Sequence, residues 1–532
     1  MNVRNDMSDL TDNFHPSSAK RYQYYLNALD AGDVYNALVG YGMLGNKVPP
    51  ALTTENFLSY FKNNQISHPR KNWCRWISFR YMRNTGAYRY FGIPNPFAYE
   101  KLSRCIEDNW DDIRKALISN SSSQPYTVNR VHLRKLHKSK AIFEMSYSNW
   151  RVDYNPIPAL FVGKRYVVHC DVSQCFPSIY THAVDWAIRG KASAKKDINN
   201  SSGSWSGQLD EVLRSTTNGE THGVLIGPHA SNIISELLLT PVDKALFGAG
   251  FRFERAIDDY ACYVETYDKA EQFIIKLETE LQKYGLTLNQ KKTKIQSLPQ
   301  ATADSWVTAL KSYRFANDPL NFKDVSNFLN LTIGLMEKPG NDWRVLLYAL
   351  KTTGRKAMTG NASNYYCSMV LHLTYIYPYL MPHFEDMLGP QNIRLIGSKM
   401  GSFFRAAFSD GLHRRDYLTA AFSLYYAMHF DKDFGDLVDE PSSIVTCDDC
   451  LLKLFALLYA RKYGYQTLSN SLVNNAQDLA RNTDDFNENW LFCYEALTKS
   501  DLDNFIPQEN CYKDSWKAIK KAKISFIDNS QL

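Results

Sequence analysis

The stretch RAIDDYACYV, residues 255–264, places two adjacent carboxylates between two runs of strand-forming residues. Before the acids, FRFERAI alternates apolar and charged side chains, and after them YACYV is aromatic and β-branched. This pattern predicts a β-hairpin with Asp258 and Asp259 at its turn. Aspartate is also a common turn residue, because its side chain hydrogen-bonds nearby backbone. Taken alone, the stretch fits a solvated turn better than a functional site.

A second stretch of sequence favours a functional site over a solvated turn. In RYVVHCDVSQCFPSIYTH, residues 165–182, a short apolar strand ends in Asp171, and Phe176 follows five residues later. Pro177 would open a helix there. If this strand lies beside the hairpin, three carboxylates converge at one end of a sheet. Crowded acids repel one another unless cations neutralise them, and Mg²⁺ is held by a few carboxylates and phosphate oxygens. The pattern therefore predicts a two-metal nucleotidyl-transfer site.

In order and spacing, these motifs resemble the palm domain of reverse transcriptases. That palm carries an Asp–x4–Phe/Tyr motif, a Gly-rich loop with its helix, and a hairpin with two Asp. Here the first two read DVSQCFPSI and HGVLIGPHASNIISELLLTPVD, and GLTLNQKKTKI is similar to the segment whose lysine approaches the nucleotide phosphates. The resemblance covers about residues 60–330, including a fingers-like YRYFGIPNPFAYEKL. It implies a fingers–palm domain of α+β class.

The resemblance gives a role to each matching residue. Asp171 and Asp258 would bind the metal ions with Asp259 in support, and the backbone carbonyl of Val172 would be a further ligand. Phe176 stands at the position of the steric gate, a ring that crowds the 2′-hydroxyl and favours deoxynucleotides. A core phenylalanine is the alternative for Phe176. Lys292 would donate a proton to the leaving pyrophosphate.

Further residues are implied to bind the nucleotide. Gly223 and Gly227 would permit close backbone approach to nucleotide or template. Ser231 would either cap the following helix or contact the substrate. Arg134 and Lys138, in VHLRKLHKSK, fall where the fingers grip the triphosphate, and the other basic residues of that segment stay candidates.

Two positions depart from the general reverse transcriptase pattern. Ala256 stands where the hairpin usually has Tyr, and Leu225 and Ile226 stand where the loop usually has Pro-Gln. Loss of that Gln removes a polar contact to the incoming nucleotide and argues against conventional templated copying. With CFPSIYTH, GPHAS and a long helical C-terminal half, these departures resemble the abortive-infection and unknown-group reverse transcriptases of bacterial phage defence.

This second resemblance implies untemplated DNA synthesis from dNTPs, primed from a protein hydroxyl, with Mg²⁺ or Mn²⁺ as cofactor. The single-stranded DNA product would stay covalently attached to one of the 34 tyrosines. The protein would form a homo-oligomer, a trimer or a hexamer, in the bacterial cytoplasm. Two alternatives stay open. One is a reverse transcriptase that copies an associated non-coding RNA, and the other is a catalytically silent RNA-binding scaffold, against which the three intact acids argue.

Composition is that of a globular protein without a membrane-spanning segment. Of 532 residues, 44% are hydrophobic, but there is no run of about 18 apolar residues and no signal-peptide core at the start. Ten scattered cysteines suit a reduced compartment. Cys447 and Cys450 lack a second pair for a zinc site and are expected to be packing thiols.

The charge is uneven along the chain. Residues 61–151 hold 17 Lys and Arg against 6 Asp and Glu, whereas residues 331–532 hold 21 against 23. Aromatic residues interleave with the basic ones in RKNWCRWISFRYMRNTGAYRYFGIPNP. Bases stack on aromatic rings while arginine holds the backbone, so this region is typical of a phosphate-binding surface.

Three domains are expected. Residues 1–60 would form an N-terminal helical segment, residues 61–330 the fingers and palm, and residues 331–532 a helical domain. In that last part, segments such as DWRVLLYALKTTGRKAM, RDYLTAAFSLYYAMHF and CLLKLFALLYARKYG carry apolar residues at helical spacing. We expect stacked helix pairs of the HEAT-like, α-solenoid kind.

Overall fold

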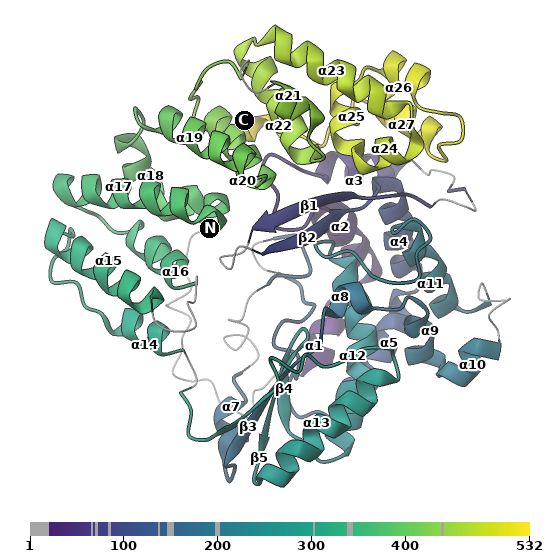
Figure 1. Ribbon diagram of the computed structural model, residues 1–532. Helices are drawn as coiled ribbons and strands as arrows, with labels where there is room; N and C mark the ends of the chain where they lie inside the picture. Colours follow the sequence, from purple (N-terminus) through teal and green to yellow (C-terminus); the bar gives the residue numbers. More distant parts are fainter. Residues whose placement is uncertain are drawn as a thin grey trace.

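A computed structural model describes residues 21–64, 68–69, 73–82, 87–136, 139–145, 154–196, 203–301, 304–337, 344–437 and 441–532. Up to residue 297 its elements are helices and two small sheets. Beyond that point the described residues form helices and no further strand (Figure 1). The predicted α+β class with a helical C-terminal region is confirmed.

The main sheet has four antiparallel strands in the order β4–β5–β3–β6. These are Phe253–Ala256 (β4), Asp259–Val264 (β5), Tyr166–Asp171 (β3) and Lys294–Ser297 (β6). β-Branched and aromatic residues favour strands. The register places Asp171 opposite Asp259. The hairpin predicted for RAIDDYACYV is therefore present, and its neighbour is the strand that ends in Asp171.

Two helices support the main sheet. α13 (Tyr267–Gln282) packs against β3 and β5, and α12 (Ala230–Gly248) packs against α13. The side chain of Thr266 accepts a hydrogen bond from the Lys269 N–H and starts α13. The apolar residues of α13 recur at helical spacing on its buried face, namely Ala270, Phe273, Leu277 and Leu281. α12 is buried along most of its length.

The second sheet is a hairpin of β1 (Ile77–Met82) and β2 (Tyr88–Ile93). Phe79 lies opposite Phe91, and their rings stack 5.6 Å apart. Directly after β2, the Asn95 side chain accepts from the first backbone N–H groups of α4.

The helices around the two sheets are α1 (Tyr22–Asn27), α2 (Ala31–Tyr41), α3 (Glu55–Asn63), α4 (Pro96–Asp108), α5 (Trp110–Ser121), α7 (Ile157–Phe161), α8 (Cys175–Ser178), α9 (His182–Arg189), α10 (Lys191–Lys196) and α11 (Trp205–Ser215).

The C-terminal region is built from helices that pack on their neighbours in the chain. Examples are α15 with α16, α19 with α20, and α22 with α23. The helices are α14 (Ser305–Ser312), α15 (Phe322–Met336), α16 (Arg344–Thr353), α17 (Gly360–Ile376), η5 (Pro378–His383), α18 (Phe384–Leu395), α19 (Met400–His413), α20 (Tyr417–His429), α21 (Pro441–Thr446), α22 (Cys450–Tyr463), α23 (Gln466–Ala480), α24 (Thr483–Glu488), α25 (Trp490–Ala496), α26 (Lys499–Phe505), α27 (Lys513–Lys521) and η6 (Asn529–Gln531). The boundary expected after residue 330 falls inside α15, which packs on α16 and α17. The division into three domains stays a prediction.

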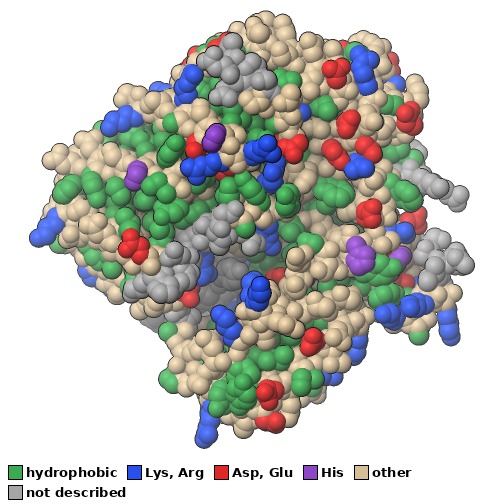
Figure 2. Space-filling model, viewed as in Figure 1, with side chains coloured by type: hydrophobic (Ala, Val, Ile, Leu, Met, Phe, Trp, Pro, Cys, Tyr) green, Lys and Arg blue, Asp and Glu red, His purple; other side chains and the backbone are tan. Residues whose placement is uncertain are grey.

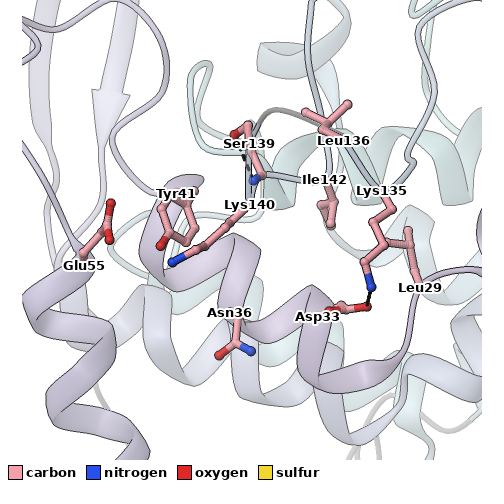
Figure 3. A pocket seen from close by; sticks show the side chains of 11 residues that line it. Leu29, Asp33, Asn36, Tyr41, Glu55, Lys135, Leu136, Ser139, Lys140 and Ile142 are labelled. Carbon is pink, nitrogen blue, oxygen red and sulfur yellow. Dashed lines mark hydrogen bonds and ion pairs between the residues drawn. The ribbon is translucent and has the colours of Figure 1, made fainter.

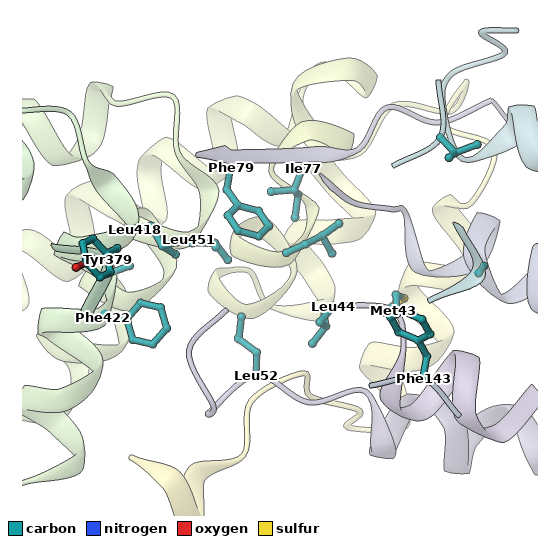
Figure 4. Packing of buried hydrophobic residues seen from close by; sticks show 14 of the residues in the cluster. Met43, Leu44, Leu52, Ile77, Phe79, Phe143, Tyr379, Leu418, Phe422 and Leu451 are labelled. Carbon is teal, nitrogen blue, oxygen red and sulfur yellow. The ribbon is translucent and has the colours of Figure 1, made fainter. Parts of the chain in front are cut away.

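The C-terminal helices cover the β1–β2 hairpin. β1 contacts η5, α20, α22 and α24. Phe79 on β1 belongs to the same buried cluster as Leu418, Phe422 and Leu451 of these helices (Figure 4). At the edge of this contact Arg75 pairs with Asp484 and Glu488 of α24, at 3.0 and 2.9 Å. The hairpin is therefore held between the two halves of the chain.

Candidate active site

One end of the main sheet carries the three predicted acids. Asp171 ends β3, Asp259 begins β5, and Asp258 lies in the turn before β5. The Val172 N–H donates to the Asp258 carbonyl at 3.1 Å. Asp171 lies opposite Asp259 on the neighbouring strand, and its carboxyl group adds to the effect of burial in raising the pKa of Asp259. The structure thus brings Asp171, Val172, Asp258 and Asp259 together, as the sequence predicts.

Burial and mutual repulsion raise the pKa of two of these carboxyls. Burial, followed by the Asp171 carboxylate, raises the pKa of Asp258, while Arg89 and Lys292 oppose the rise. Burial, followed by the Asp258 charge, raises the pKa of Asp259 to about 7. A divalent cation would relieve this repulsion, and an all-oxygen donor set suits Mg²⁺.

The acids are not arranged as a closed ligand shell. Within the described ranges, no group of three or more His, Cys, Asp or Glu side chains forms a metal-binding cluster. Instead, the two oxygens of Asp171 accept from Asn289 Nδ2 at 3.0 Å and from Lys292 Nζ at 2.7 Å. The residues fit a magnesium ion by charge and donor type, and the ion itself stays a prediction.

Lys292 reaches the acids because its segment is tied to β3. The Asn289 N–H donates to the Asp171 carbonyl at 2.8 Å, and the Lys292 N–H donates to the Asn289 carbonyl at 3.0 Å. The side chain of Lys292 is 63% exposed, whereas that of Asp171 is 11% exposed. A buried carboxylate and a solvent-facing ammonium therefore meet at the edge of the site.

A buried arginine supports the turn that presents Asp258. Arg255 is 1% exposed and pairs with Glu236 at 2.8 Å and with Asp243 at 2.7 Å. Its Nη1 donates to the Ile257 carbonyl at 2.7 Å. Ile257 has a φ of +61°, a conformation that β-branched residues rarely adopt. The cation therefore fixes a strained residue directly before Asp258.

Sequence reasoning missed this role of Arg255, although a signal was present. Side chains on a strand alternate between its two faces. In FRFERAI this alternation puts Arg255 on the same face as Phe253, which is fully buried. A charged residue at a core position needs buried partners, and the acids of α12 provide them.

Phe176 and the Gly-rich loop lie next to each other. Phe176 is partly exposed in α8, and its carbonyl accepts from the Val224 N–H at 3.0 Å. Gly223 and Gly227 have φ values of +88° and +126°, which favour glycine. The Gly92 N–H of β2 donates to the Ile226 carbonyl at 2.9 Å. The loop is therefore fixed between α8 and the β1–β2 hairpin.

Ser231 does not cap α12. The residue that precedes this helix is His229, without a side-chain cap, and the Ser231 hydroxyl donates to the Leu225 carbonyl at 2.7 Å. Ser231 is 6% exposed. Of the two roles left open for Ser231, the helix cap is therefore excluded, because its hydroxyl is bonded to the preceding loop, and the substrate contact stays a prediction.

In the segment expected to bind the triphosphate, two basic residues form ion pairs with acidic side chains outside the site. Arg134 Nη2 lies 3.6 Å from Glu144, and Lys135 pairs with Asp33 at 2.8 Å. Lys135 lines a pocket of about 650 Å³ beside α2 and α3 (Figure 3). Lys138 lies outside the described residues. The assignment of Arg134 and Lys138 to the triphosphate stays a prediction.

Arg89 of β2 is a cation that acts on one of the three acids. Its guanidinium lowers the pKa of Asp258, which places it near the turn. Its neighbour on the same face of β2, Phe91, lies against Gly227. The sequence contains Arg89 in the fingers-like YRYFGIPNP, but which face of that strand points to the acids depends on how the hairpin docks.

Two further observations concern expectations outside this site. Cys447 and Cys450 are buried free thiols, 7% and 1% exposed. None of the helices in the described part of the chain is both long enough and apolar enough to cross a membrane.

Comparisons with known proteins relate the region that holds the acids to one family. Residues 85–323 match the family described as reverse transcriptase (RNA-dependent DNA polymerase). No curated protein matches the chain.

Several solved structures of telomerase are similar to the chain. Apo telomerase from Candida tropicalis is 11% identical over 87% of this chain and 71% of its own, with a TM-score of 0.31. Telomerase from Candida albicans in complex with a TWJ fragment of telomeric RNA is 14% identical over 89% and 70%, with a TM-score of 0.28. A Candida tropicalis telomerase truncated from the C-terminal domain is 16% identical over 46% of this chain, with a TM-score of 0.26. The chain spans 54% of that truncated protein.

Proposed function

Because residues 85–323 match the reverse transcriptase family, we propose that this protein is a DNA polymerase of antiphage defence that joins dNTPs without a template, starting from a protein primer. The observation that carries the proposal is the meeting of Asp171, Asp258 and Asp259 with Lys292 at one end of the main sheet. Three crowded acids beside a solvent-facing ammonium suit phosphoryl transfer better than a passive scaffold, which has no physical need for them.

The residues of this site divide the work of nucleotidyl transfer. Asp171, Asp258 and the Val172 carbonyl would hold Mg²⁺ or Mn²⁺, with Asp259 in support. When bound, the ions would activate the attacking oxygen and stabilise the leaving one. Lys292 would hold its proton at Nζ and give it to the leaving pyrophosphate. Phe176 would crowd the 2′ position of the sugar and so select dNTPs.

The Gly-rich loop supports untemplated synthesis. Ile226 stands where the loop usually has Gln, and it is a partly exposed, apolar side chain. It offers no amide to the incoming nucleotide, and a polymerase without that contact relies less on pairing with a template.

The proposal is tested by incubating the purified protein with Mg²⁺ and each labelled dNTP, without template or primer. Products are compared on a denaturing gel before and after protease, beside an Asp258→Asn control of nearly equal size. We expect label that migrates with the protein until digestion and is absent from the control. Mass spectrometry of the labelled peptide then identifies the priming tyrosine, and light scattering measures whether the protein is a trimer or a hexamer.

Other outcomes separate the alternatives. Incorporation that needs a co-purified or added RNA would favour a reverse transcriptase that copies a non-coding RNA. Absence of incorporation with Mg²⁺ or Mn²⁺, and with or without RNA, would overturn the polymerase proposal in favour of an RNA-binding scaffold.

A further inference from the structure

Two cysteines from opposite ends of the chain lie side by side at one edge of the contact between the β1–β2 hairpin and the C-terminal helices. The Sγ atoms of Cys74 and Cys511 are 3.9 Å apart, within hydrogen-bonding distance for sulfur. Cys74 lies just before β1, and Cys511 lies just before α27. Of the ten free cysteines, Cys105 and Cys511 are partly exposed and the others are buried. The pair therefore joins a partly exposed thiol to a buried one.

Cys511 has the surroundings of a reactive thiolate. The hydrogen bond with the Cys74 thiol is the main cause that lowers the pKa of Cys511; burial opposes it, and the ammonium of Lys101 on α4 lowers the pKa further. Burial raises the pKa of Cys105 to about 11, although Lys101 acts on this thiol as well. The thiolate, and not the thiol, is the nucleophile that attacks oxidants. Cys511 and Cys105 thus share a cation and partial exposure, but they differ in the thiol partner.

The noncovalent contacts beside this pair are exposed to solvent. Arg75, which follows Cys74, forms ion pairs with Asp484 and Glu488, and the exposed fractions of the three side chains lie between 43% and 53%. Figure 2 shows acidic and basic side chains close together over the C-terminal helices. Exposed ion pairs contribute little to stability. A covalent bond at this edge would therefore change how firmly the start of β1 is attached to these helices.

The two sulfurs can reach bonding distance through a small movement. They are 3.9 Å apart, whereas a disulfide bond is about 2.05 Å long, so a change of one side-chain rotamer is enough to close the gap. The backbone of Cys74 is held in place, because its N–H donates to the Ser215 carbonyl at 3.3 Å and its carbonyl accepts from the Asn218 N–H at 3.0 Å. Cys511 lies in the segment between α26 and α27, and its partly exposed side chain is the one that can turn.

We propose that Cys511 and Cys74 form a peroxide-reactive thiol pair, whose oxidation links the β1–β2 hairpin to the C-terminal helices by a disulfide bond. The Cys511 thiolate would attack a hydroperoxide and break its O–O bond. Its sulfur is oxidised to a sulfenic acid, and the other peroxide oxygen takes a proton and leaves as an alcohol, or as water from hydrogen peroxide. The Cys74 sulfur would then attack the Cys511 sulfur, and the sulfenic oxygen would leave as water with the Cys74 proton.

The same hydrogen bond explains why Cys74 reacts second. Bonding to Cys511 is the main cause that raises the pKa of Cys74, followed by burial. Once Cys511 is a neutral sulfenic acid, this main cause is removed and Cys74 can lose its proton more readily. Neither step needs a nucleotide or a metal ion, so the inference does not depend on the proposed function.

The test titrates hydrogen peroxide against the reduced, full chain. Remaining thiols are blocked with N-ethylmaleimide, and the peptides are mapped by mass spectrometry without reduction. We expect the peptides of Cys74 and Cys511 to be linked, and dithiothreitol to separate them. Cys105 is the control within the same protein, and it should stay a free thiol at peroxide concentrations that link the pair. Before oxidation, iodoacetamide at pH 7 should label Cys511 at least about tenfold faster than Cys105.

Three variants separate the two steps. Cys511→Ser should form no link. Cys74→Ala should react more slowly with peroxide, because the thiol donor is lost, and should stop at a sulfenic acid that dimedone traps on Cys511. Cys105→Ser should form the link like the unaltered protein. Thermal melting checks that each variant folds, and the peptide map of the unaltered protein gives an answer without them.

Urea unfolding tests whether the native fold accommodates the bond. A cross-link between residues 437 positions apart constrains the unfolded chain. The oxidised protein should therefore unfold at a higher urea concentration than the reduced one, and Cys511→Ser should show no such difference. A lower midpoint after oxidation overturns the proposal, and so does peroxide that modifies Cys105 as readily as Cys511 without linking the pair. If the link forms in a protein that incorporates no dNTP, the thiol pair stands and the proposed function falls.

Discussion

The Lys292 ammonium and the Asp171 carboxylate lie 2.7 Å apart, so a candidate proton donor is hydrogen-bonded to a candidate metal ligand. They have to separate before both take part in catalysis. Lys292 is the partner free to move, because its side chain faces solvent while Asp171 is held by Asn289 and by the backbone of β3.

Replacing Lys292 by Met should lower both the rate of incorporation and the Mg²⁺ concentration that it requires. Loss of the proton donor should slow incorporation about 100-fold. The Mg²⁺ concentration for half-maximal rate should fall, because Asp171 loses a competing cation. Both are measured from rates over a Mg²⁺ series. The control is Lys291→Met, an exposed neighbour of equal charge, and a Lys292→Met rate equal to that of the control would remove Lys292 from the mechanism.

Replacing Phe176 by Ala should relax the choice of sugar. The ring is partly exposed beside the Gly-rich loop, so its removal opens space for a 2′-hydroxyl. The ratio of ribonucleotide to deoxynucleotide incorporation should rise at least about tenfold, as measured with matched labelled nucleotides. Phe322→Ala, which alters an exposed ring on α15, is the control. An unchanged ratio would favour the reading of Phe176 as a core residue.

Replacing Arg255 by Met should destabilise the fold strongly. The substitution leaves Glu236 and Asp243 buried without their cation, and breaking a buried ion pair costs about 3–5 kcal/mol. Urea unfolding measures the loss, with the exposed Arg314→Met as control. Arg255→Lys should fall between the two, because it keeps the charge but not the fork that reaches the Ile257 carbonyl. A loss below about 1 kcal/mol for Arg255→Met would show that the turn is held by other contacts.

His229 should make stability depend on pH. Burial lowers its pKa from 6.5 to about 4. Between these values the unfolded chain binds a proton that the native state does not, so the stability is fully present above pH 6.5 and is lost as pH falls toward 4. From pH 7.5 to pH 5 the loss should be about 2 kcal/mol. Urea unfolding at both values should show a smaller loss for His229→Gln, whereas the exposed His413→Gln should behave like the unaltered protein.

Local sequence patterns predicted where the three acids lie, but they did not predict the contacts of the residues around them. The meeting of Asp171, Asp258 and Asp259 was predictable because each stands at the end of an alternating or apolar strand, and the family resemblance implies that these strands are neighbours. The pairing of Arg255 with α12 joins residues that are not neighbours in the sequence. The approach of Arg89 depends on how the β1–β2 hairpin docks on the Gly-rich loop. The residue type of Ser231 left a helix cap open as one of its two roles, but in the structure its hydroxyl donates to the Leu225 carbonyl of the preceding loop.

The reverse transcriptase match begins at residue 85, between the two strands of the β1–β2 hairpin. A fragment of residues 85–323 would contain β2 as an unpaired edge strand, with its N–H and C=O groups and the Phe91 ring uncovered. Such edges template aggregation. The fragment would also lack α20 and α22, which cover β1 in the intact chain. The smallest piece that recombination can move as a folded unit is therefore larger than residues 85–323, the part that matches the family. It also includes β1 and the C-terminal helices that cover it.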